Sequence, residues 1–326
     1  MSQEQKPNLR NLGAAIAKNH FNGVPVEFIV PPGTPVVFVS DMFAQDYSGG
    51  AELTTEAIIK KSPHRVFKVH SQSLTVDMLE KYQDRYWIIC NFTQADVAAL
   101  AYLAQSKIKY SIVEYDYKYC IFRSEVMHQK QTGHSCDCPL RPHGILVEKL
   151  YSGAQHIFWM SEKQKEQFVS KIPSLIFAPD GKHIVQGSVF DDQTLDKLVS
   201  LREVHAKAVS NIPIKIWGVQ GSQNWIKGTQ ETIKWCTEKK LPVKVLGNMA
   251  YETFLAELAS CHGLVFQPLD FDTCPRIVIE AKIMGCELEL NNNVQHKDEL
   301  WFTKSSDEIV SHLKTRGEYF WSHISL

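Results

Sequence analysis

The sequence from residue 264 onward reads Leu264-Val265-Phe266-Gln267-Pro268, then Leu269-Asp270-Phe271-Asp272-Thr273-Cys274, then Pro275-Arg276-Ile277-Val278-Ile279-Glu280-Ala281-Lys282-Ile283-Met284-Gly285. Within the stretch from Gly263 to Asn291, this order predicts an apolar strand, a short polar loop and a helix. Pro275 favours the first helical position, because the N–H that proline lacks has no partner there. Gly285 favours the left-handed conformation that ends a helix. The helix is therefore predicted to begin at Pro275 and to stop at Gly285.

One carboxylate, that of Glu280, lies in the middle of this predicted helix. The helix is otherwise apolar nearly all round, which indicates that it is buried. An ionised carboxylate stays in such a place only when other groups hydrogen-bond it. Two interpretations follow: Glu280 holds the two hydroxyls of a nucleotide ribose, or it pairs with a neighbouring Lys or Arg.

A similar strand, turn and helix is predicted near the start of the chain. Residues 35–40 form an apolar run of strand length, and a loop then leads to Gly49-Gly50-Ala51-Glu52, which opens a helix through Lys60. Gly49 and Gly50 carry no Cβ, so their backbone can approach a phosphate or a sugar closely. The alternative interpretation is a tight turn without a ligand.

Strand and helix patterns alternate along most of the chain. In the first half the predicted strands are 65–70, 86–90, 110–113, 154–160 and 174–178, and the predicted helices are 75–82, 94–105, 144–151 and 161–170. In the second half, predicted strands at 214–218, 243–246, 264–268 and 287–290 repeat the pattern. Such alternation predicts an α/β fold with parallel sheets covered by helices. We expect two Rossmann-like domains, residues 1–190 and 191–326, with residues 1–33 as a polar, irregular tail.

Three short motifs resemble one family. Gly49-Gly50-Ala51-Glu52 resembles a turn after the first strand, Lys227-Gly228 resembles a Lys-Gly pair after a later strand, and Asp272 with Glu280 resembles a pair of acids. Together they are similar to the retaining nucleotide-sugar glycosyltransferases of family 4, which have the GT-B fold of two facing Rossmann-like domains. Two departures stand out: the first acid is usually Glu, and the family's Arg is missing near residues 219–221.

The resemblance implies a function and a set of site residues. It implies transfer of a sugar from a nucleoside-diphosphate sugar to an acceptor hydroxyl with retention, without a catalytic metal. Asp272 would orient the sugar, Lys227 would neutralise the diphosphate and Glu280 would hold the ribose. Arg276 would substitute for the missing Arg, and a helix N-terminus would add an anion site. The implied donor ligands are Gly49, Gly50, Lys227, Gly228, Thr273, Cys274, Arg276 and Glu280.

Other functions remain open beside this one. The same scaffold suits a nucleotide-sugar epimerase or phosphorylase, and the missing Arg also suits a binding protein that turns nothing over. For transfer, the acceptor is unidentified: a glycan, a lipid, a small molecule, a protein or a modified nucleobase. Glu114, Asp116 and Lys118 follow a central strand, where a ligand of a parallel sheet binds, so they are candidates for the acceptor side. The alternative is a solvated loop.

Residues 118–143 break the alternation and concentrate cysteine and histidine. The segment contains Cys120, His128, His134, Cys136, Cys138 and His143. Thiolates and imidazoles are the ligands of tetrahedral zinc, and Cys120, His128, Cys136 and Cys138 would form a Cys₃His site. The spacing matches none of the common zinc signatures. The alternative is a mobile loop near the acceptor side that a partner orders.

Composition limits the class of protein. The 326 residues carry a formal net charge of −1, which gives no support to a non-specific nucleic-acid or membrane surface. No eighteen apolar residues run together and no secretory signal is recognisable, so we expect a cytoplasmic protein without a transmembrane segment. The eight cysteines in a chain of this length are then predicted to be free or metal-bound rather than a disulfide framework.

Overall fold

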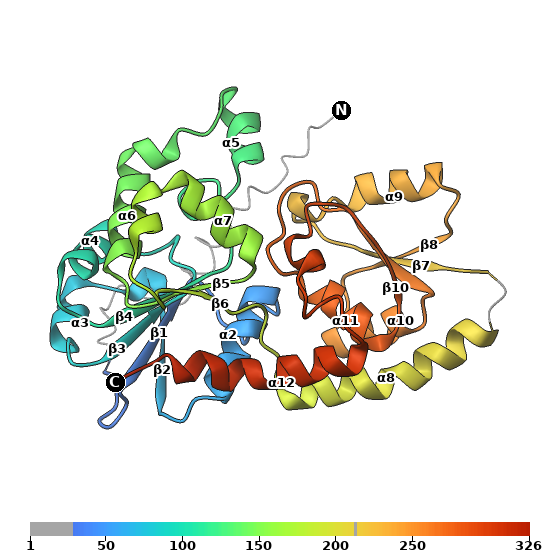
Figure 1. Ribbon diagram of the computed structural model, residues 1–326, viewed down its shortest axis with the longest axis horizontal. Coiled ribbons are helices and arrows are strands. Elements are labelled where there is room, and N and C mark those ends of the chain that lie inside the picture. The colour runs from blue at the N-terminus through green and yellow to red at the C-terminus, as the bar shows by residue number, and fades with distance from the viewer. Residues whose placement is uncertain (1–28, 212–213) are drawn as a thin grey trace, which may run out of the picture. The chain divides into compact units, whose positions relative to one another are not determined.

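The computed structural model describes residues 29–211 and 214–326, and residues 33–326 form one compact unit. Its first half contains a parallel sheet in the order β2-β1-β3-β4-β5-β6 (Figure 1). The strands are β1 (Val36–Ser40), β2 (Val66–His70), β3 (Tyr86–Ile89), β4 (Tyr110–Glu114), β5 (Ile157–Trp159) and β6 (His183–Val185). The strand order reverses between β1 and β3, and such a reversal is where parallel sheets bind ligands.

Helices cover this sheet. They are α2 (Gly50–Lys60), α3 (Val76–Lys81), α4 (Val97–Gln105), α5 (Glu125–Thr132), α6 (Pro142–Gly153) and α7 (Glu162–Lys171), with short 3-10 helices at Ser71–Ser73 (η1), Cys138–Leu140 (η2) and Pro173–Phe177 (η3). Helix α4 contacts both α3 and α6, whereas α2 contacts the C-terminal helix α12 (Ser306–Ser322). The connections between parallel strands place helices on the faces of the sheet, and these helices form such connections.

The second half contains a four-stranded parallel sheet in the order β10-β9-β7-β8. Its strands are β7 (Trp217–Gln220), β8 (Val243–Leu246), β9 (Gly263–Phe266) and β10 (Glu287–Leu290). Helix α9 (Thr229–Glu238) lies on one face, and α8 (Asp192–Asn211), α10 (Tyr251–Ala259) and α11 (Arg276–Met284) lie on the other (Figure 1). Two 3-10 helices, η4 (Trp225–Lys227) and η5 (Gln295–Asp298), complete this half. Here the strand order reverses between β7 and β9.

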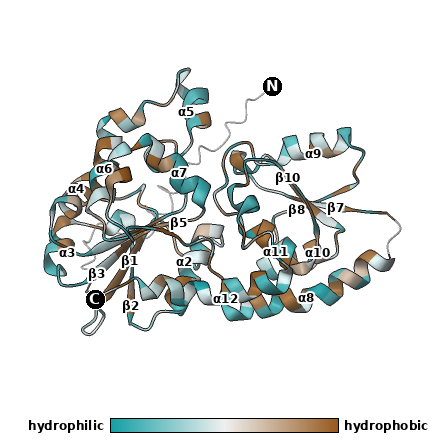
Figure 2. Ribbon diagram, in the orientation of Figure 1, coloured by the Kyte–Doolittle hydropathy of each residue, from teal (hydrophilic) through white to brown (hydrophobic). Residues whose placement is uncertain are grey.

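The apolar runs of the sequence form the buried layer of the fold. Figure 2 shows hydrophobic colouring concentrated along the strands of the first sheet, while the helices carry hydrophilic residues as well. All five residues of β1 and all four of β9 are buried. One cluster of buried apolar side chains extends from β1 and α2 to β9, α11 and α12. The predicted α/β class with parallel sheets covered by helices is confirmed.

The C-terminal helix α12 links the end of the chain to the first sheet. Ser305 caps its first turn, and a capping box with Glu308 is complete. Near its end, the indole Nε1 of Trp321 donates a hydrogen bond of 2.8 Å to the carbonyl of Ile58 in α2. Phe320 packs on Phe158 of β5 with ring centroids 4.2 Å apart. The aromatic side chains near the end of α12 therefore pack on the first half of the chain.

One local prediction was wrong, and one helix was not predicted. The predicted strand at 174–178 is absent: residues 174–177 belong to the 3-10 helix η3, and the sixth strand is β6. A short apolar run does not separate the two by periodicity, and Phe177 is 86% exposed, which a central strand would not allow. The segment 118–143 also contains α5, whose polar sequence lacks an apolar stripe. Its ends are set by Ser124, which accepts a hydrogen bond from Met127 N, and by Gly133 with φ of 80°.

The domain boundary stays a prediction. β6 ends at Val185 and α8 begins at Asp192, so the predicted boundary near residue 190 falls in the connection between the two sheets. The predicted irregular tail lies mostly outside the described residues, because residues 1–28 are not described. Helix α11 begins one residue later than predicted: Pro275 is its N-cap, with ψ of 118°, and Gly285 ends it with φ of 91°.

A glycine between η4 and α9 is required by its backbone. Gly228 has φ of 58°, and a Cβ there would lie 2.8 Å from the carbonyl oxygen of Gln267. Gly228→Ala is therefore expected to lower the free energy of unfolding by about 2–3 kcal/mol, through left-handed strain and this contact. The matched control is Gly181→Ala, where φ is 82° and no atom lies within 4 Å, so only the strain of about 1 kcal/mol applies. Chemical unfolding of both variants measures the difference, and equal losses would contradict the steric argument.

Candidate functional site

The carboxyl ends of both sheets open on one cleft. Its cavity volume is about 580 Å³. From the first half it is lined by the loop after β1, the first turn of α2 and the loop after β4; from the second half, by the loops after β7, β8 and β9. Both strand-order reversals therefore face the same space. In open parallel sheets this is the location of ligand sites, so the cleft is the candidate functional site.

Two helix N-termini point at the cleft without a side-chain cap. Helix α2 has Gly49 as its N-cap and α11 has Pro275, and neither N-cap side chain accepts a hydrogen bond. Gly49 lacks room for a side chain, since a Cβ would lie 2.3 Å from the Glu52 carboxylate and 2.6 Å from the Tyr47 ring. At Gly50 a Cβ would make only an ordinary contact of 3.7 Å with Arg276. The N–H groups and dipoles of helix N-termini favour an anion. At α2 the carboxylate of Glu52, in the first turn, already accepts a hydrogen bond from its own backbone N–H.

Lys227 and Asp272 form an ion pair on the wall of the cleft. Lys227 ends η4, Asp272 lies in the loop after β9, and their charged atoms are 2.5 Å apart. The side chains are 24% and 12% exposed, so both reach solvent in the cleft. A parallel bridge between Asp272 and Val294, with Asp272 N donating to the carbonyl of Asn293 at 2.8 Å, fixes the loop. The structure thus brings the predicted lysine and first acid together.

Glu280 and Arg276 lie at the base of the cleft, one turn apart on α11. The Nε atom of Arg276 is 3.6 Å from Glu280 Oε1, and Tyr251 donates a hydrogen bond of 2.6 Å to the same oxygen. Burial raises the pKa of Glu280, and the charge of Arg276 opposes that shift. The guanidinium also donates to the carbonyl of Val189 and lies 3.7 Å from the centre of the Phe190 ring. Of the two interpretations of Glu280, pairing with an arginine is present in the structure.

Arg123 is a cleft residue that the sequence analysis missed. It lies in the loop before α5 with φ of 56°, and it donates hydrogen bonds of 2.9 Å to both Asp41 and Asp116. Asp41 follows β1 and Asp116 follows β4, so one guanidinium joins the loops of two strands. No pattern in the sequence links these three residues, which are 82 and 7 positions apart. Each cation of the cleft wall named here, Lys227, Arg276 and Arg123, faces a carboxylate.

The acceptor-side prediction needs a correction for two of its three residues. Glu114 and Lys118 are 0% and 3% exposed and form a buried ion pair of 2.8 Å, away from the cleft lining. Tyr151 donates a further hydrogen bond to Glu114. Only Asp116 reaches the cleft, where Lys118 and Arg123 hold the pKa of Asp116 below its usual value although burial opposes them. The loop is therefore not a solvated one; a buried network positions Asp116.

The pH dependence of stability tests this network. Burial raises the pKa of Glu114 from its ordinary value of 4.5 to about 7, with Lys118 opposing and Asp116 adding to the shift. The folded chain then holds this proton more tightly than the unfolded chain, so the group favours folding below about pH 4.5 and loses that contribution as the pH rises through about 7. Glu114→Gln removes the titration. Between about pH 5 and pH 8, wild-type protein is expected to lose on the order of 3 kcal/mol more unfolding free energy than the variant. Urea unfolding at several pH values measures this, and parallel curves would contradict it.

Further residues of the cleft come from the second sheet. Gly221 after β7 and Gly247 after β8 lie in such close contact that a Cβ at Gly247 would be 2.5 Å from the Gly221 carbonyl oxygen. Thr273 and Cys274 also line the cleft. The Thr273 hydroxyl donates to the Tyr115 carbonyl at 2.8 Å, which ties the loop after β9 to the loop after β4. Gly228 is not part of the lining; its role is the turn described above.

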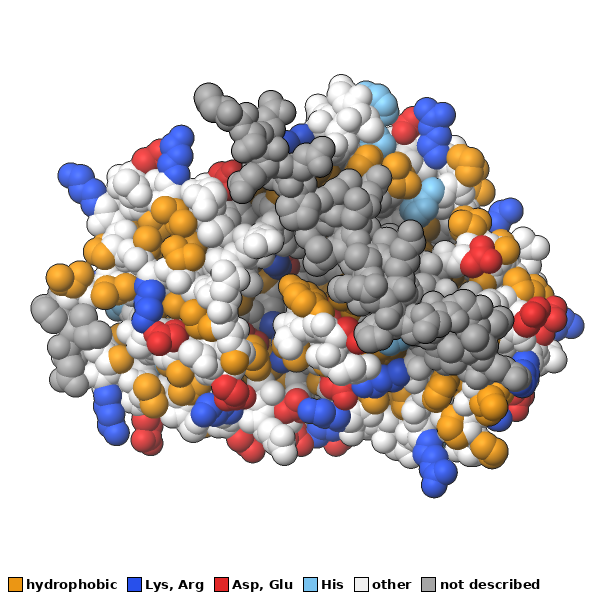
Figure 3. Space-filling view, turned by 180° about the vertical axis from the view of Figure 1, so that it is seen from behind, with side chains coloured by type: hydrophobic (Ala, Val, Ile, Leu, Met, Phe, Trp, Pro, Cys, Tyr) orange, Lys and Arg blue, Asp and Glu red, His pale blue; other side chains and the backbone are white. Residues whose placement is uncertain are grey.

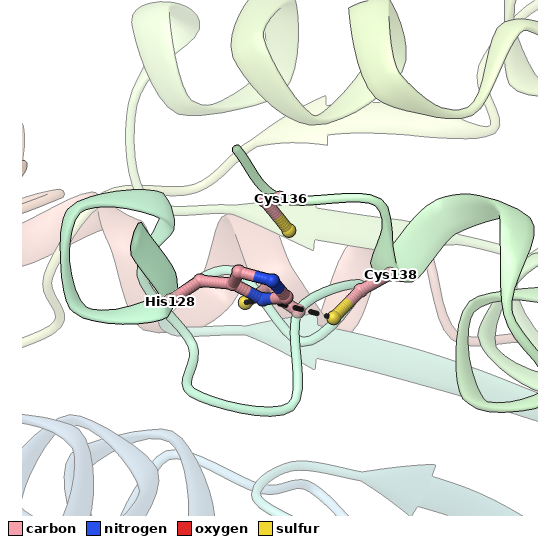
Figure 4. Close-up of side chains that lie close together, drawn as sticks. His128, Cys136 and Cys138 are labelled. Atoms are coloured by element: carbon pink, nitrogen blue, oxygen red, sulfur yellow. Dashed lines mark hydrogen bonds between the residues drawn. The ribbon is translucent and has the colours of Figure 1, made fainter. Parts of the chain in front are cut away.

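The structure also brings together the four residues predicted for zinc. Cys120, His128, Cys136 and Cys138 each place one ligand atom within 4.8 Å of the others. Figure 4 shows the thiols of Cys136 and Cys138 near the ring of His128, with the hydrogen bond between His128 and Cys138 dashed. His143 is not among them, because its Nε2 contacts the carbonyl of Lys118 at 2.8 Å. All eight cysteines of the chain are free thiols.

The described surface has no extended patch of one charge on the face that Figure 3 shows. Lys and Arg side chains there lie interspersed with Asp and Glu. Among residues 29–211 and 214–326, no helix has the length and apolar character needed to cross a membrane.

Among known proteins, solved structures are similar to this chain in fold. The sequence matches no protein-family model and no curated protein. HepE from Anabaena, solved in complex with UDP and glucose, is 14% identical over 88% of this chain and 91% of its own, with a TM-score of 0.48. A UDP-forming trehalose-phosphate synthase from Burkholderia xenovorans is 10% identical over 76% and 72%, with a TM-score of 0.46. UDP-GlcNAc 2-epimerase from Neisseria meningitidis, bound to UDP-GlcNAc, is 13% identical over 88% and 92%, with a TM-score of 0.42. Likenesses at this level assign neither a substrate nor a reaction to this chain.

Proposed function

We propose that the chain transfers a sugar from a nucleoside-diphosphate sugar to an acceptor hydroxyl, with retention, as a GT-B enzyme similar to family 4. The observation that carries the proposal is the cleft. Two strand-order reversals, two uncapped helix N-termini and the side chain of Lys227 meet there. A diphosphate needs this combination of positive charge and free N–H groups.

The charges of the cleft suit a leaving diphosphate. As the bond between sugar and phosphate breaks, negative charge grows on the phosphate, and fixed donors that face it lower the barrier. Lys227 suits this role because it reaches solvent and has a single carboxylate partner, whereas Arg123 is held by two aspartates. That partner, Asp272, also reaches solvent and can turn to a sugar hydroxyl. If Arg276 turns to the diphosphate, a carboxylate oxygen of Glu280 becomes available to the ribose hydroxyls. Asp116 lies on the opposite wall, where the acceptor would enter.

A second candidate is a nucleotide-sugar-binding protein without turnover. One observation favours it: Arg276 is held by Val189, Phe190 and Glu280, and Arg123 by two aspartates, so neither guanidinium is free for a diphosphate. The family's additional Arg near residues 219–221 is absent from the sequence. Under this alternative, Lys227 and the helix N-termini hold the ligand, but the transition state gains too little charge stabilisation for transfer.

The test begins with thermal unfolding of the full chain in the presence of a panel of nucleoside-diphosphate sugars. A ligand that binds only the folded state raises its stability by RT ln(1 + [L]/Kd). We expect at least one nucleotide sugar to raise the Tm, and the matching free sugar not to. The absence of any shift across the panel would remove the proposed function.

Product analysis with the best nucleotide sugar then separates the reactions. Incubation without acceptor distinguishes an epimerase, which converts the donor, from a transferase, which at most hydrolyses it slowly. Incubation with acceptor mixtures reveals transfer, and the configuration of the product at the anomeric carbon tests retention. Binding without any product in either incubation would favour the binding protein.

A further inference from the structure

The Cys/His cluster, defined as Cys120, His128, Cys136 and Cys138, lies outside the cleft lining and is not used by the proposed function. Its four ligand atoms come from four short pieces of chain. Cys120 lies in the loop after β4, His128 on α5, Cys136 in the loop that follows, and Cys138 at the start of η2. Three of the four residues are buried, and Cys136 is half-buried.

The distances in the cluster match a tetrahedral metal site. Bonds of about 2.3 Å from zinc to sulfur and about 2.1 Å to nitrogen place a sulfur and a nitrogen ligand about 3.6 Å apart. The Nδ1 atom of His128 lies 3.4 Å from the Cys138 sulfur and 3.8 Å from the Cys120 sulfur. An ion at the centre of the four atoms would therefore need only small side-chain adjustments.

The remaining nitrogen of His128 supports the same assignment. Its Nε2 atom is buried and has no hydrogen-bond partner within the described part of the chain. The nearest acid is Asp137, whose Oδ1 lies 4.0 Å from Nε2. If Nδ1 binds a metal, the proton must lie on Nε2, and a carboxylate beside that N–H is the usual support of a metal-bound histidine. Without a metal, Nδ1 faces only two thiols, which are weak hydrogen-bond donors.

The backbone around the cluster is already held in place. Gly144 of α6 lies so close to η2 that a Cβ would be 2.2 Å from the Cys138 carbonyl oxygen. Arg123 N donates a hydrogen bond of 2.8 Å to the carbonyl of Cys120. The Ser124 hydroxyl also contacts the carboxylate of Asp270, in the loop after β9. A site of this kind loses little further chain entropy when the ion enters, which favours tight binding.

We propose that Cys120, His128, Cys136 and Cys138 bind one structural zinc ion. Three thiolates and one imidazole complete a tetrahedron, so no position is left open for a substrate or an activated water. In the sequence, Arg123 lies between the ligands Cys120 and His128. Its side chain joins Asp41 and Asp116 on the cleft wall. The ion fixes the loop that carries this arginine. This site does not depend on the proposed sugar transfer.

Metal content and ligand geometry are measured on the full wild-type chain. Protein purified without chelator or metal-affinity steps is expected to contain about one equivalent of zinc by elemental analysis, because sites of this class hold zinc very tightly. Replacement by Co²⁺ should give the visible absorption of a tetrahedral thiolate site. Less than roughly a tenth of an equivalent of zinc after expression with added zinc would overturn the proposal. A disulfide among these cysteines in the purified protein, or bound iron instead of zinc, would also overturn it.

A matched pair of cysteine variants assigns the site. Cys136→Ser changes the half-buried ligand, so it is the ligand substitution that folding tolerates best, and it is expected to lower the zinc content at least fivefold. Cys261→Ser, at a buried thiol that hydrogen-bonds Glu257 at 3.4 Å, should retain full zinc. In wild-type protein, a chelator should increase hydrogen exchange at residues 120–138 while β1 and β3 stay protected. Equal zinc in both variants, or exchange unaffected by the chelator, would contradict the assignment.

Discussion

Lys227→Gln is expected to reduce sugar transfer about 10²–10³-fold, the cost of removing one fixed donor from a developing negative charge. In the ligand-free chain the Lys227 ammonium is 2.5 Å from the Asp272 carboxylate, and both reach the solvent of the cleft. The same substitution is therefore expected to change the free energy of unfolding by only about 1 kcal/mol, as for other partly exposed pairs. The measurements are kcat and KM with the nucleotide sugar found by thermal unfolding, and a denaturation curve.

The size of the effect on each quantity decides the role of Lys227. A loss in kcat places the charge of Lys227 on the diphosphate in the transition state, whereas a rise in KM alone indicates uniform binding. Lys163→Gln is the matched control, since Lys163 pairs with Asp298 on the surface at 2.6 Å and does not line the cleft. Unchanged transfer in Lys227→Gln would remove this residue from the proposed site and favour a purely structural pair with Asp272.

Glu280→Gln is expected to affect both stability and donor binding. Arg276 and Glu280 are buried, and removal of one partner of such a pair costs about 3–5 kcal/mol. Arg276 keeps its contacts with Val189 and Phe190, so we expect the lower end, about 3 kcal/mol of unfolding free energy. If the carboxylate also holds the ribose, charge-assisted hydrogen bonds become ordinary ones and donor binding weakens by about 1–3 kcal/mol.

The two numbers on this one variant separate the two interpretations of Glu280. Lower stability with unchanged donor affinity would leave Glu280 as the partner of Arg276 alone, and the ribose assignment would fail. Glu257→Gln is the control, because Glu257 pairs with Lys244 on the surface and both side chains are more than a third exposed. The affinity for the donor is measured at a temperature well below the Tm of the variant, so that the variant is folded throughout.

Local signals in the sequence were enough for most elements of the fold. A helix was predicted to begin at Ser161, and the Ser161 hydroxyl accepts a hydrogen bond from Gln164 N at the start of α7. Gly285 was predicted to end the helix after the loop, and its φ is 91°. These two predictions were correct because helix caps and apolar periodicity depend on residues that are close in the sequence. The strand predicted at 174–178 was wrong because so short an apolar stretch does not show whether its periodicity is that of a strand or of a helix.

The sequence by itself determined the α/β class and the charged side chains available to the candidate site, including Lys227, Asp272 and Glu280. Only the tertiary structure decided their partners. Lys227 and Asp272 are 45 residues apart, and Arg123 joins an acid 82 residues away, so no local pattern reports either contact. The sequence did not show burial either: Glu114 ends a strand and Lys118 follows it, yet both are buried, with residues of α6 in contact with each. The strand order and the packing of loops set which charges meet, because side-chain contacts depend on distance in space and not along the chain.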